Sequence, residues 1–156
     1  KPYKCTSNIP TIGYGATFYL NGTKVKIDDQ DINKADATVL LCKMVQLFED
    51  QVNSFLDCDL NQNQYDALIS LSYNIGWNGL KKSTLMNVLN TNPNDDAIKT
   101  HWMKWVNSAG RKSNGLVKRR NLELELYFKS SYSKKTLAEM AKEIMNINKF
   151  DDEIYI

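Results

Sequence analysis

The sequence has 156 residues, of which 42% are hydrophobic and 24% are charged. This length fits one domain with a sizeable core, and the composition excludes a disordered chain. The net charge of +2 does not indicate a nucleic-acid binder, and no apolar run is long enough to cross a membrane. The three cysteines cannot all pair and form no Cys-x-x-Cys motif, so neither a zinc site nor a disulfide framework is predicted.

The first predicted element is a small antiparallel sheet over residues 11–27. Thr11, Ile12 and Tyr14 alternate as in a strand. Asn21-Gly22 stands between two runs of β-prone residues. This dipeptide predicts a hairpin with a type I′ turn, in which both central residues have positive φ.

A long helix is predicted next, from the capping residue Asn33 to about residue 56. Its apolar residues recur at three- and four-residue spacing and form one buried stripe: Ala37, Leu40, Leu41, Met44, Val45, Phe48, Val52 and Phe55. At about 1.5 Å per residue the helix spans roughly 35 Å, enough to link two lobes.

Five further helices are predicted, and most begin at a capping residue or a proline. The helix after Asn61 is apolar nearly all round, which places it at the centre of a helical lobe. The expected starts and ends are Asn61 to Gly76, Ser83 to Leu89, Pro93 to Val106, Leu116 to Lys129, and Ser133 to Asn146. In the helix from Leu116 to Lys129, the residues Val117, Leu122 and Leu126 lie on the predicted apolar side.

The N-terminal segment carries a recognisable pattern, which reads Tyr3-x-Cys5, five residues, then Thr11-Ile12-Gly13-Tyr14-Gly15. It resembles the active-site segment of phage-type lysozymes, the endolysins of glycoside hydrolase family 24. The resemblance covers roughly residues 1–129. It extends to Gln64-Tyr65-Asp66-Ala67-Leu68, Tyr73-Asn74-Ile75-Gly76, Ser83-Thr84-Leu85, Trp105 and Gly115-Leu116-Val117-x-Arg119-Arg120-x-x-Glu123.

This resemblance implies an α+β, mainly α, lysozyme-like fold. A small antiparallel sheet lobe (about 1–32) and a larger helical lobe (about 33–129) would be joined by the long helix, with glycan bound between them. Residues 130–156 would form a C-terminal helical extension. That extension is interpreted either as an amphipathic helix packed on the core or as a small wall-binding repeat.

The resemblance also implies catalytic roles. The family's set is a Glu, eight residues, Asp or Cys, five residues, then Thr, and Cys5 and Thr11 match its second half. Glycoside hydrolysis needs a proton donor and, across the sugar, a nucleophile or an activated water. Cys5 would then act as base or nucleophile and Thr11 would position water. The competing interpretation of Cys5 is a buried, inert thiol, and that of Thr11 is an ordinary strand threonine.

The proton-donating Glu would stand nine positions before Cys5, upstream of Lys1. Three explanations remain open: the sequence begins late, the protein is processed or engineered without that segment, or it is a catalytically inactive relative. Acid–base catalysis contributes about 10²–10⁴-fold. We therefore expect a chain that truly starts at Lys1 to have little lytic activity.

Other residues receive roles from the resemblance. Arg119 and Arg120 are candidates for pairing with the acid's carboxylate, the alternative being helix-surface charges. The expected sugar contacts are Gly13, Tyr14, Tyr73, Asn74 and Thr84, although a residue such as Tyr73 is more commonly plain core.

The function that follows is a muramidase, cleaving the β-1,4 bond between N-acetylmuramic acid and N-acetylglucosamine without metal or cofactor. The alternative is an inactive lysozyme-like domain that binds peptidoglycan or a phage protein. The expected partner is bacterial peptidoglycan, with no nucleic acid, no stable membrane insertion and a monomeric state. The expected location is the host cytoplasm until release, or outside the cell if an upstream signal segment exists.

Overall fold

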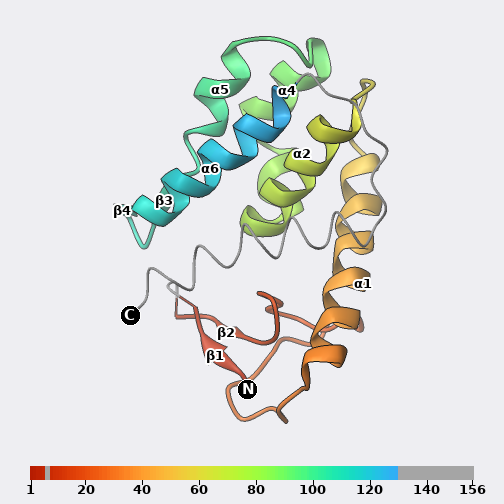
Figure 1. Ribbon diagram of the computed structural model, residues 1–156, viewed down its shortest axis with the longest axis vertical. Coiled ribbons are helices and arrows are strands. Elements are labelled where there is room, and N and C mark those ends of the chain that lie inside the picture. Colours follow the sequence, from red (N-terminus) through yellow and green to blue (C-terminus); the bar gives the residue numbers. More distant parts are fainter. Residues whose placement is uncertain (6–7, 130–156) are drawn as a thin grey trace.

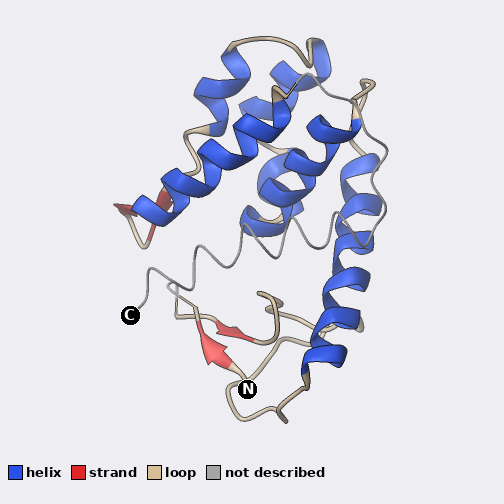
Figure 2. Cartoon of the chain, in the orientation of Figure 1, coloured by secondary structure: helices blue, strands red, loops and turns tan. Residues whose placement is uncertain are grey.

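A computed structural model of the chain describes residues 1–5 and 8–129; the predicted helix after Ser133 lies outside these residues. The fold is α+β and mainly α, as predicted. The N-terminal strands lie at one end of the molecule and the cluster of helices, with a second pair of short strands, at the other, and the long helix α1 (Lys34–Asn53) runs between them (Figures 1 and 2). We call residues 1–32 the sheet lobe and residues 33–129 the helical lobe.

The sheet lobe is less regular than predicted. Strand β1 (Tyr3–Lys4) pairs antiparallel with β2 (Pro10–Thr11). Beyond them are two isolated bridges, from Ile12 to Ala16 and from Phe18 to Lys24. A small core holds the lobe together, and it consists of Ile12, Ala16 and Val25 with Tyr19, Ile32 and Leu40 packed against them.

The turn at Asn21-Gly22 exists, but the type I′ prediction is wrong. Gly22 has φ 81°, whereas Asn8 and Ala109 are the only described non-glycine residues with positive φ. The Gly22 N–H donates to the Tyr19 carbonyl at 2.8 Å, and the Tyr19 N–H donates to the Thr23 carbonyl at 2.8 Å. These bonds close a three-residue loop. The Asn21 side chain favours it by accepting from the Thr23 N–H at 3.0 Å.

Helix α1 begins where its cap predicts, because the Asn33 side chain accepts from the Asp36 N–H. It ends at Asn53, three residues short of the expected end, and at about 1.5 Å per residue it spans roughly 30 Å. Its predicted stripe is largely confirmed, with six positions buried: Ala37, Leu41, Met44, Val45, Phe48 and Val52.

Four helices build the middle of the helical lobe. They are α2 (Gln62–Ile75), α3 (Trp77–Lys81), α4 (Thr84–Thr91) and α5 (Ala97–Trp102). The Asn61 capping box and the Ser83 cap are both present, as predicted. Helix α2 is central and packs against both α1 and α6 (Asn114–Tyr127). The helix expected from Pro93 starts only at Ala97.

A short hairpin lies between α5 and α6. Strand β3 (Asn107–Ser108) pairs antiparallel with β4 (Arg111–Lys112). The two linking residues, Ala109 (φ 49°) and Gly110 (φ 77°), both have positive φ, as a type I′ turn requires. Among the described residues, no helix is long and apolar enough to cross a membrane.

Helix α6 buries a charged face, which the sequence analysis did not predict. Leu122, expected on its apolar side, is 36% exposed. Its buried residues are Gly115, Arg119, Arg120, Glu123 and Tyr127. The interpretation of the two arginines as surface charges is therefore wrong.

Candidate functional site

Cys5 and Thr11 meet around one backbone carbonyl. Cys5 directly follows β1, and Thr11 ends β2 opposite Tyr3. The Cys5 N–H donates to the Ile9 oxygen at 3.1 Å, and the Thr11 hydroxyl donates to the same oxygen at 2.9 Å. The chain folds back between them because the Asn8 N–H, at φ 60°, donates to the Cys5 carbonyl at 2.7 Å. The strand pair therefore brings the two residues together.

The two side chains differ in exposure. Cys5 is half-buried, whereas Thr11 is only 2% exposed. The Thr11 proton is used at Ile9, so its oxygen can still accept a hydrogen bond but has no proton to donate. Because Thr11 is 2% exposed, its hydroxyl has little access to a sugar or to water in this conformation.

Tyr73, at the end of α2, links the helical lobe to the sheet lobe. Its hydroxyl donates to the Tyr14 carbonyl at 3.1 Å. The Tyr73 ring lies close enough to Gly15 that a β-carbon there would stand 3.5 Å from it. Burial raises the pKa of Tyr73, nearby Tyr3 adds to this effect, and Arg119 opposes it. Tyr73 therefore lies within electrostatic reach of groups from both lobes.

Aromatic contacts reinforce this link. The Phe48 ring lies 5.1 Å from the Tyr73 ring and 4.7 Å from the Trp77 ring, between ring centroids. Trp77 in turn meets Phe18 of the sheet lobe at 5.9 Å, edge to face. Edge-on arrangements of this kind are favourable beyond the area that they bury. The lobes are thus joined by packed rings as well as by α1.

A buried carboxylate, Glu123, organises the helical side of the site. It is 0% exposed and accepts from the Ser70 hydroxyl at 2.9 Å and from the Trp102 indole N–H at 2.9 Å. Both arginines reach it: Arg119 Nε donates at 3.0 Å and Arg120 Nη2 at 2.9 Å. Three helices, α2, α5 and α6, therefore converge on one acceptor.

Arg119 and Arg120 were expected to pair with the family's acid, but in this structure both arginines already donate to Glu123. Arg120 is 0% exposed and also donates to the Trp105 carbonyl at 3.1 Å, so it is held inside the helical lobe. Arg119 opposes the rise in the pKa of Tyr73, so it lies within electrostatic reach of the residue that links the lobes. Sequence analysis missed the role of Glu123, although its spacing of four residues from Arg119 is a signal for an ion pair within a helix.

The other predicted contacts lie apart from one another. Gly13 packs against α1, where a β-carbon would stand 3.3 Å from that of Ala37. Asn74 is exposed near the end of α2. Thr84 is exposed at the start of α4 and lines a hollow of about 230 Å³.

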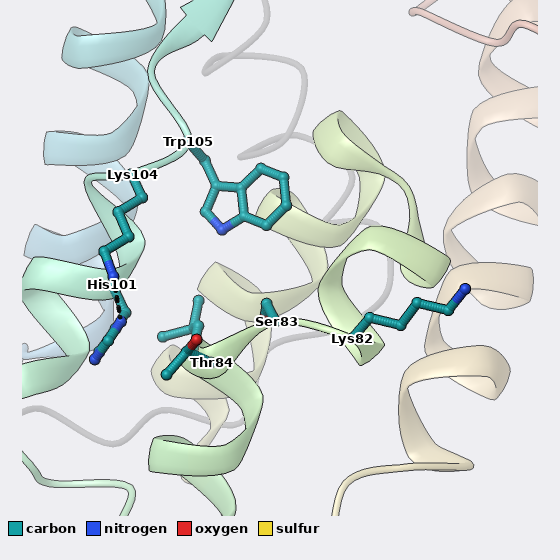
Figure 3. A pocket seen from close by; sticks show the side chains of 7 residues that line it. Lys82, Ser83, Thr84, His101, Lys104 and Trp105 are labelled. Carbon is teal, nitrogen blue, oxygen red and sulfur yellow. Dashed lines mark hydrogen bonds between the residues drawn. The ribbon is translucent and has the colours of Figure 1, made fainter.

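That hollow lies between α4, the loop before it and the end of α5. The Trp105 indole faces Thr84 across it, and Lys104 turns toward His101, with 3.1 Å between Lys104 Nζ and His101 Nδ1 (Figure 3). Cys5 and Thr11 do not line it. Trp105 and His101 are residues to which sequence analysis gave no binding role.

Comparison with known proteins identifies the family of this chain. The model of the family described as "Phage lysozyme" matches residues 1–123. The endolysin of Bacillus phage B103 is 40% identical over 144 residues, which cover 91% of this chain and 52% of that protein. This chain thus spans about half the length of that relative.

Two further relatives are covered more completely. The endolysin of Salmonella phage P22 is 36% identical over 127 residues, covering 81% of this chain and 85% of that protein. Among solved structures, the endolysin of Escherichia coli O157:H7 phage FAHEc1 superposes with a TM-score of 0.69 at 33% identity. That alignment covers 86% of this chain and 85% of the other.

Proposed function

Since this chain belongs to the phage lysozyme family, we propose that it hydrolyses the β-1,4 bond between N-acetylmuramic acid and N-acetylglucosamine in bacterial peptidoglycan. Relatives named endolysins support this activity. The observation that supports the assignment best is that the Cys5 backbone N–H and the Thr11 hydroxyl both donate to the Ile9 carbonyl, because this brings the two residues of the family's pattern close together.

In the proposed reaction, an acid protonates the leaving glycosidic oxygen while an oxocarbenium-like transition state forms. The Cys5 sulfur acts across the sugar ring, either attacking it or taking a proton from the attacking water. The thiolate is the active form, and Lys4 supplies an adjacent positive charge. Thr11 orients the water through the acceptor capacity of its hydroxyl oxygen, once its side chain has become accessible.

The glycan would lie between the two lobes. We assign sugar contacts to Tyr14, Tyr73 and Asn74 near the link between the lobes, and to Thr84 on the helical side. Gly13 contributes by holding the strand close to α1. Arg119 is the better placed of the two arginines to meet the family's acid, because it lies near Tyr73.

The test measures reducing sugar released from purified peptidoglycan. The chain is used both starting at Lys1 and extended upstream by a family segment that puts a Glu nine positions before Cys5. In the extended form we expect Cys5→Ala to lower the rate by about 10²–10⁴-fold. Cys42→Ala is the matched control, since Cys42 is a half-buried thiol on α1.

Equal rates for Cys5→Ala and Cys42→Ala would remove Cys5 from the mechanism. Binding to peptidoglycan without any release of reducing sugar would favour an inactive wall-binding domain instead. We further propose that the protein works as a monomer on the cell wall after release from the cell interior. Related proteins include several named SAR-endolysins, so the route of release is a separate question for fractionation.

A further inference from the structure

Although the net charge of this protein is small, its basic and acidic residues are unevenly distributed along the sequence. From residue 97 to residue 122 the sequence contains no Asp or Glu, and its cations are Lys99, Lys104, Arg111, Lys112, Lys118, Arg119 and Arg120. From Asp28 to Asp66 the pattern is reversed. That stretch has only Lys34 and Lys43 as cations, against Asp28, Asp29, Asp31, Asp36, Glu49, Asp50, Asp57, Asp59 and Asp66.

The structure gives independent support for a negative region. Burial and the neighbouring Asp50 and Asp66 raise the pKa of Glu49. Burial and the nearby Glu49 raise the pKa of Tyr65 to about 12, against a smaller opposing effect from Asn53. Carboxylates are therefore dense enough around the end of α1 and the start of α2 to act on one another. An anionic polymer would be repelled from this side.

The opposite side presents cations that form no salt bridge among residues 1–5 and 8–129. Of the basic residues between 97 and 122, Arg119 and Arg120 are buried with Glu123, and Lys99 pairs with Asp96 at 2.8 Å. The remaining four are exposed, and none forms a salt bridge with a carboxylate in the part of the chain that the structure describes. We call these four, Lys104, Arg111, Lys112 and Lys118, the basic hairpin surface.

The backbone holds Arg111 and Lys112 together on one hairpin. The β3–β4 hairpin carries Arg111 and Lys112, and its base is closed by the Ser113 N–H, which donates to the Val106 carbonyl at 2.8 Å. Lys104 precedes this base, and Lys118 lies in the early part of α6. The hairpin projects beside the start of α6, on the side of the helical lobe toward β1 (Figure 1).

We infer that the basic hairpin surface binds linear polyol-phosphate polymers of the bacterial wall and so holds the enzyme on its substrate. A chain of phosphodiesters offers regularly repeated charges that several cations can engage at once, which isolated peptide carboxylates do not. Nucleic acid has the same backbone chemistry, but its single-stranded binders add aromatic stacking platforms. The hairpin segment from Asn107 to Lys118, which carries three of the four cations, contains no aromatic residue, and Trp105 and His101 lie beside Lys104 alone.

The experiment is co-sedimentation of the full chain with wall sacculi that carry poly(glycerol phosphate), compared with sacculi from which hydrofluoric acid has removed it. We expect the Arg111→Gln/Lys112→Gln variant to bind the intact sacculi roughly tenfold more weakly at low salt, and its salt dependence to be shallower. The control Lys24→Gln/Lys43→Gln removes the same charge elsewhere and should bind as the parent does. The exchange Arg111→Lys/Lys112→Arg should retain binding.

Three results would overturn the inference: equal loss in the control variant, unchanged binding after the polymer is removed, or stronger competition by double-stranded DNA than by soluble poly(glycerol phosphate). This inference rests on the proposed function only because that function brings the protein to the bacterial wall, where the polymer is found. The two can fail separately, because release of reducing sugar from stripped sacculi, measured with the variants in the upstream-extended form, reports hydrolysis and should be the same for all of them.

Discussion

The two lobes of this protein hold their shape by different means. The helical lobe has a large apolar core with a fully buried ionic cluster around Glu123. The sheet lobe has two-residue strands and a core of three buried side chains, Ile12, Ala16 and Val25. The candidate catalytic residues lie on the less regular side. The difference indicates that one lobe supplies stability, while the other is free to adjust around a substrate.

The strongest test of this contrast is Glu123→Gln. The substitution leaves the guanidinium groups of Arg119 and Arg120 buried without their carboxylate. Removing one partner of a buried ion pair costs about 3–5 kcal/mol, so the free energy of unfolding should fall by that amount in urea titrations. Glu125→Gln, at an exposed position of the same helix, should change it by no more than about 0.5 kcal/mol. Equal effects would mean that the buried cluster adds nothing.

Large-to-small changes in the two apolar cores come next. Leu68→Ala, in the centre of α2 at 0% exposure, should lower the free energy of global unfolding by about 2–5 kcal/mol. Val25→Ala should mainly lower the free energy of local opening in the sheet lobe, because it touches only the small core. Native-state hydrogen exchange separates the two outcomes. If Val25→Ala speeds exchange equally in α2, the lobes open together and the contrast fails.

Tyr73→Phe tests the link between the lobes. It removes the hydrogen bond to the Tyr14 carbonyl but keeps the ring against Phe48. A hydrogen bond of this kind contributes about 0.5–1.5 kcal/mol. We expect faster hydrogen exchange in the sheet lobe with little change in the helical lobe. Tyr65→Phe, which removes a bond to Asn53 within the helical lobe, is the matched control and should leave sheet-lobe exchange unchanged.

The smallest expected effect depends on pH and belongs to the sheet lobe. The Lys26 backbone N–H and then the Tyr19 hydroxyl donate to Asp29, and both hold the pKa of Asp29 below its ordinary value. The stability that this carboxylate adds is present above the unfolded-state pKa of about 3.9 and is lost as pH falls through the lower folded value. Asp29→Asn should therefore destabilise the sheet lobe at neutral pH, but not at a pH below the folded-state pKa of Asp29. Hydrogen exchange of the sheet-lobe amides, measured at both pH values, checks this. Asp31→Asn, nearby and exposed, should have no such pH-dependent effect.

Local rules predicted most of the helices. Asn33, Asn61 and Ser83 cap the helices that they were expected to cap, because each interaction involves residues only three apart. The turns were harder to predict. Asn21-Gly22 forms a three-residue loop, and the type I′ geometry occurs instead at Ala109-Gly110, where alanine gives no turn signal. The burial of Arg119 and Arg120 was missed because charged residues are rarely buried without a partner, and that partner network needs three helices.

The site was predictable only in part. The spacing of Cys5 and Thr11 led to both candidate catalytic residues, and strand pairing explains why they meet. Their sharing of the Ile9 carbonyl and the burial of Thr11 do not follow from the spacing of the two residues alone. The bond from Tyr73 to Tyr14 joins residues 59 apart in the sequence. No local pattern contains that information.

The position of Glu123 in the chain has a consequence for how the protein is made. Its carboxylate accepts from Ser70, which was synthesised 53 residues earlier, and from Trp102. A nascent chain that has exposed only α1 to α5 therefore carries these donors without their acceptor. The last turns of α6 must leave the ribosome before that interior can close, so ribosome-bound chains cut before residue 123 should remain accessible to proteases.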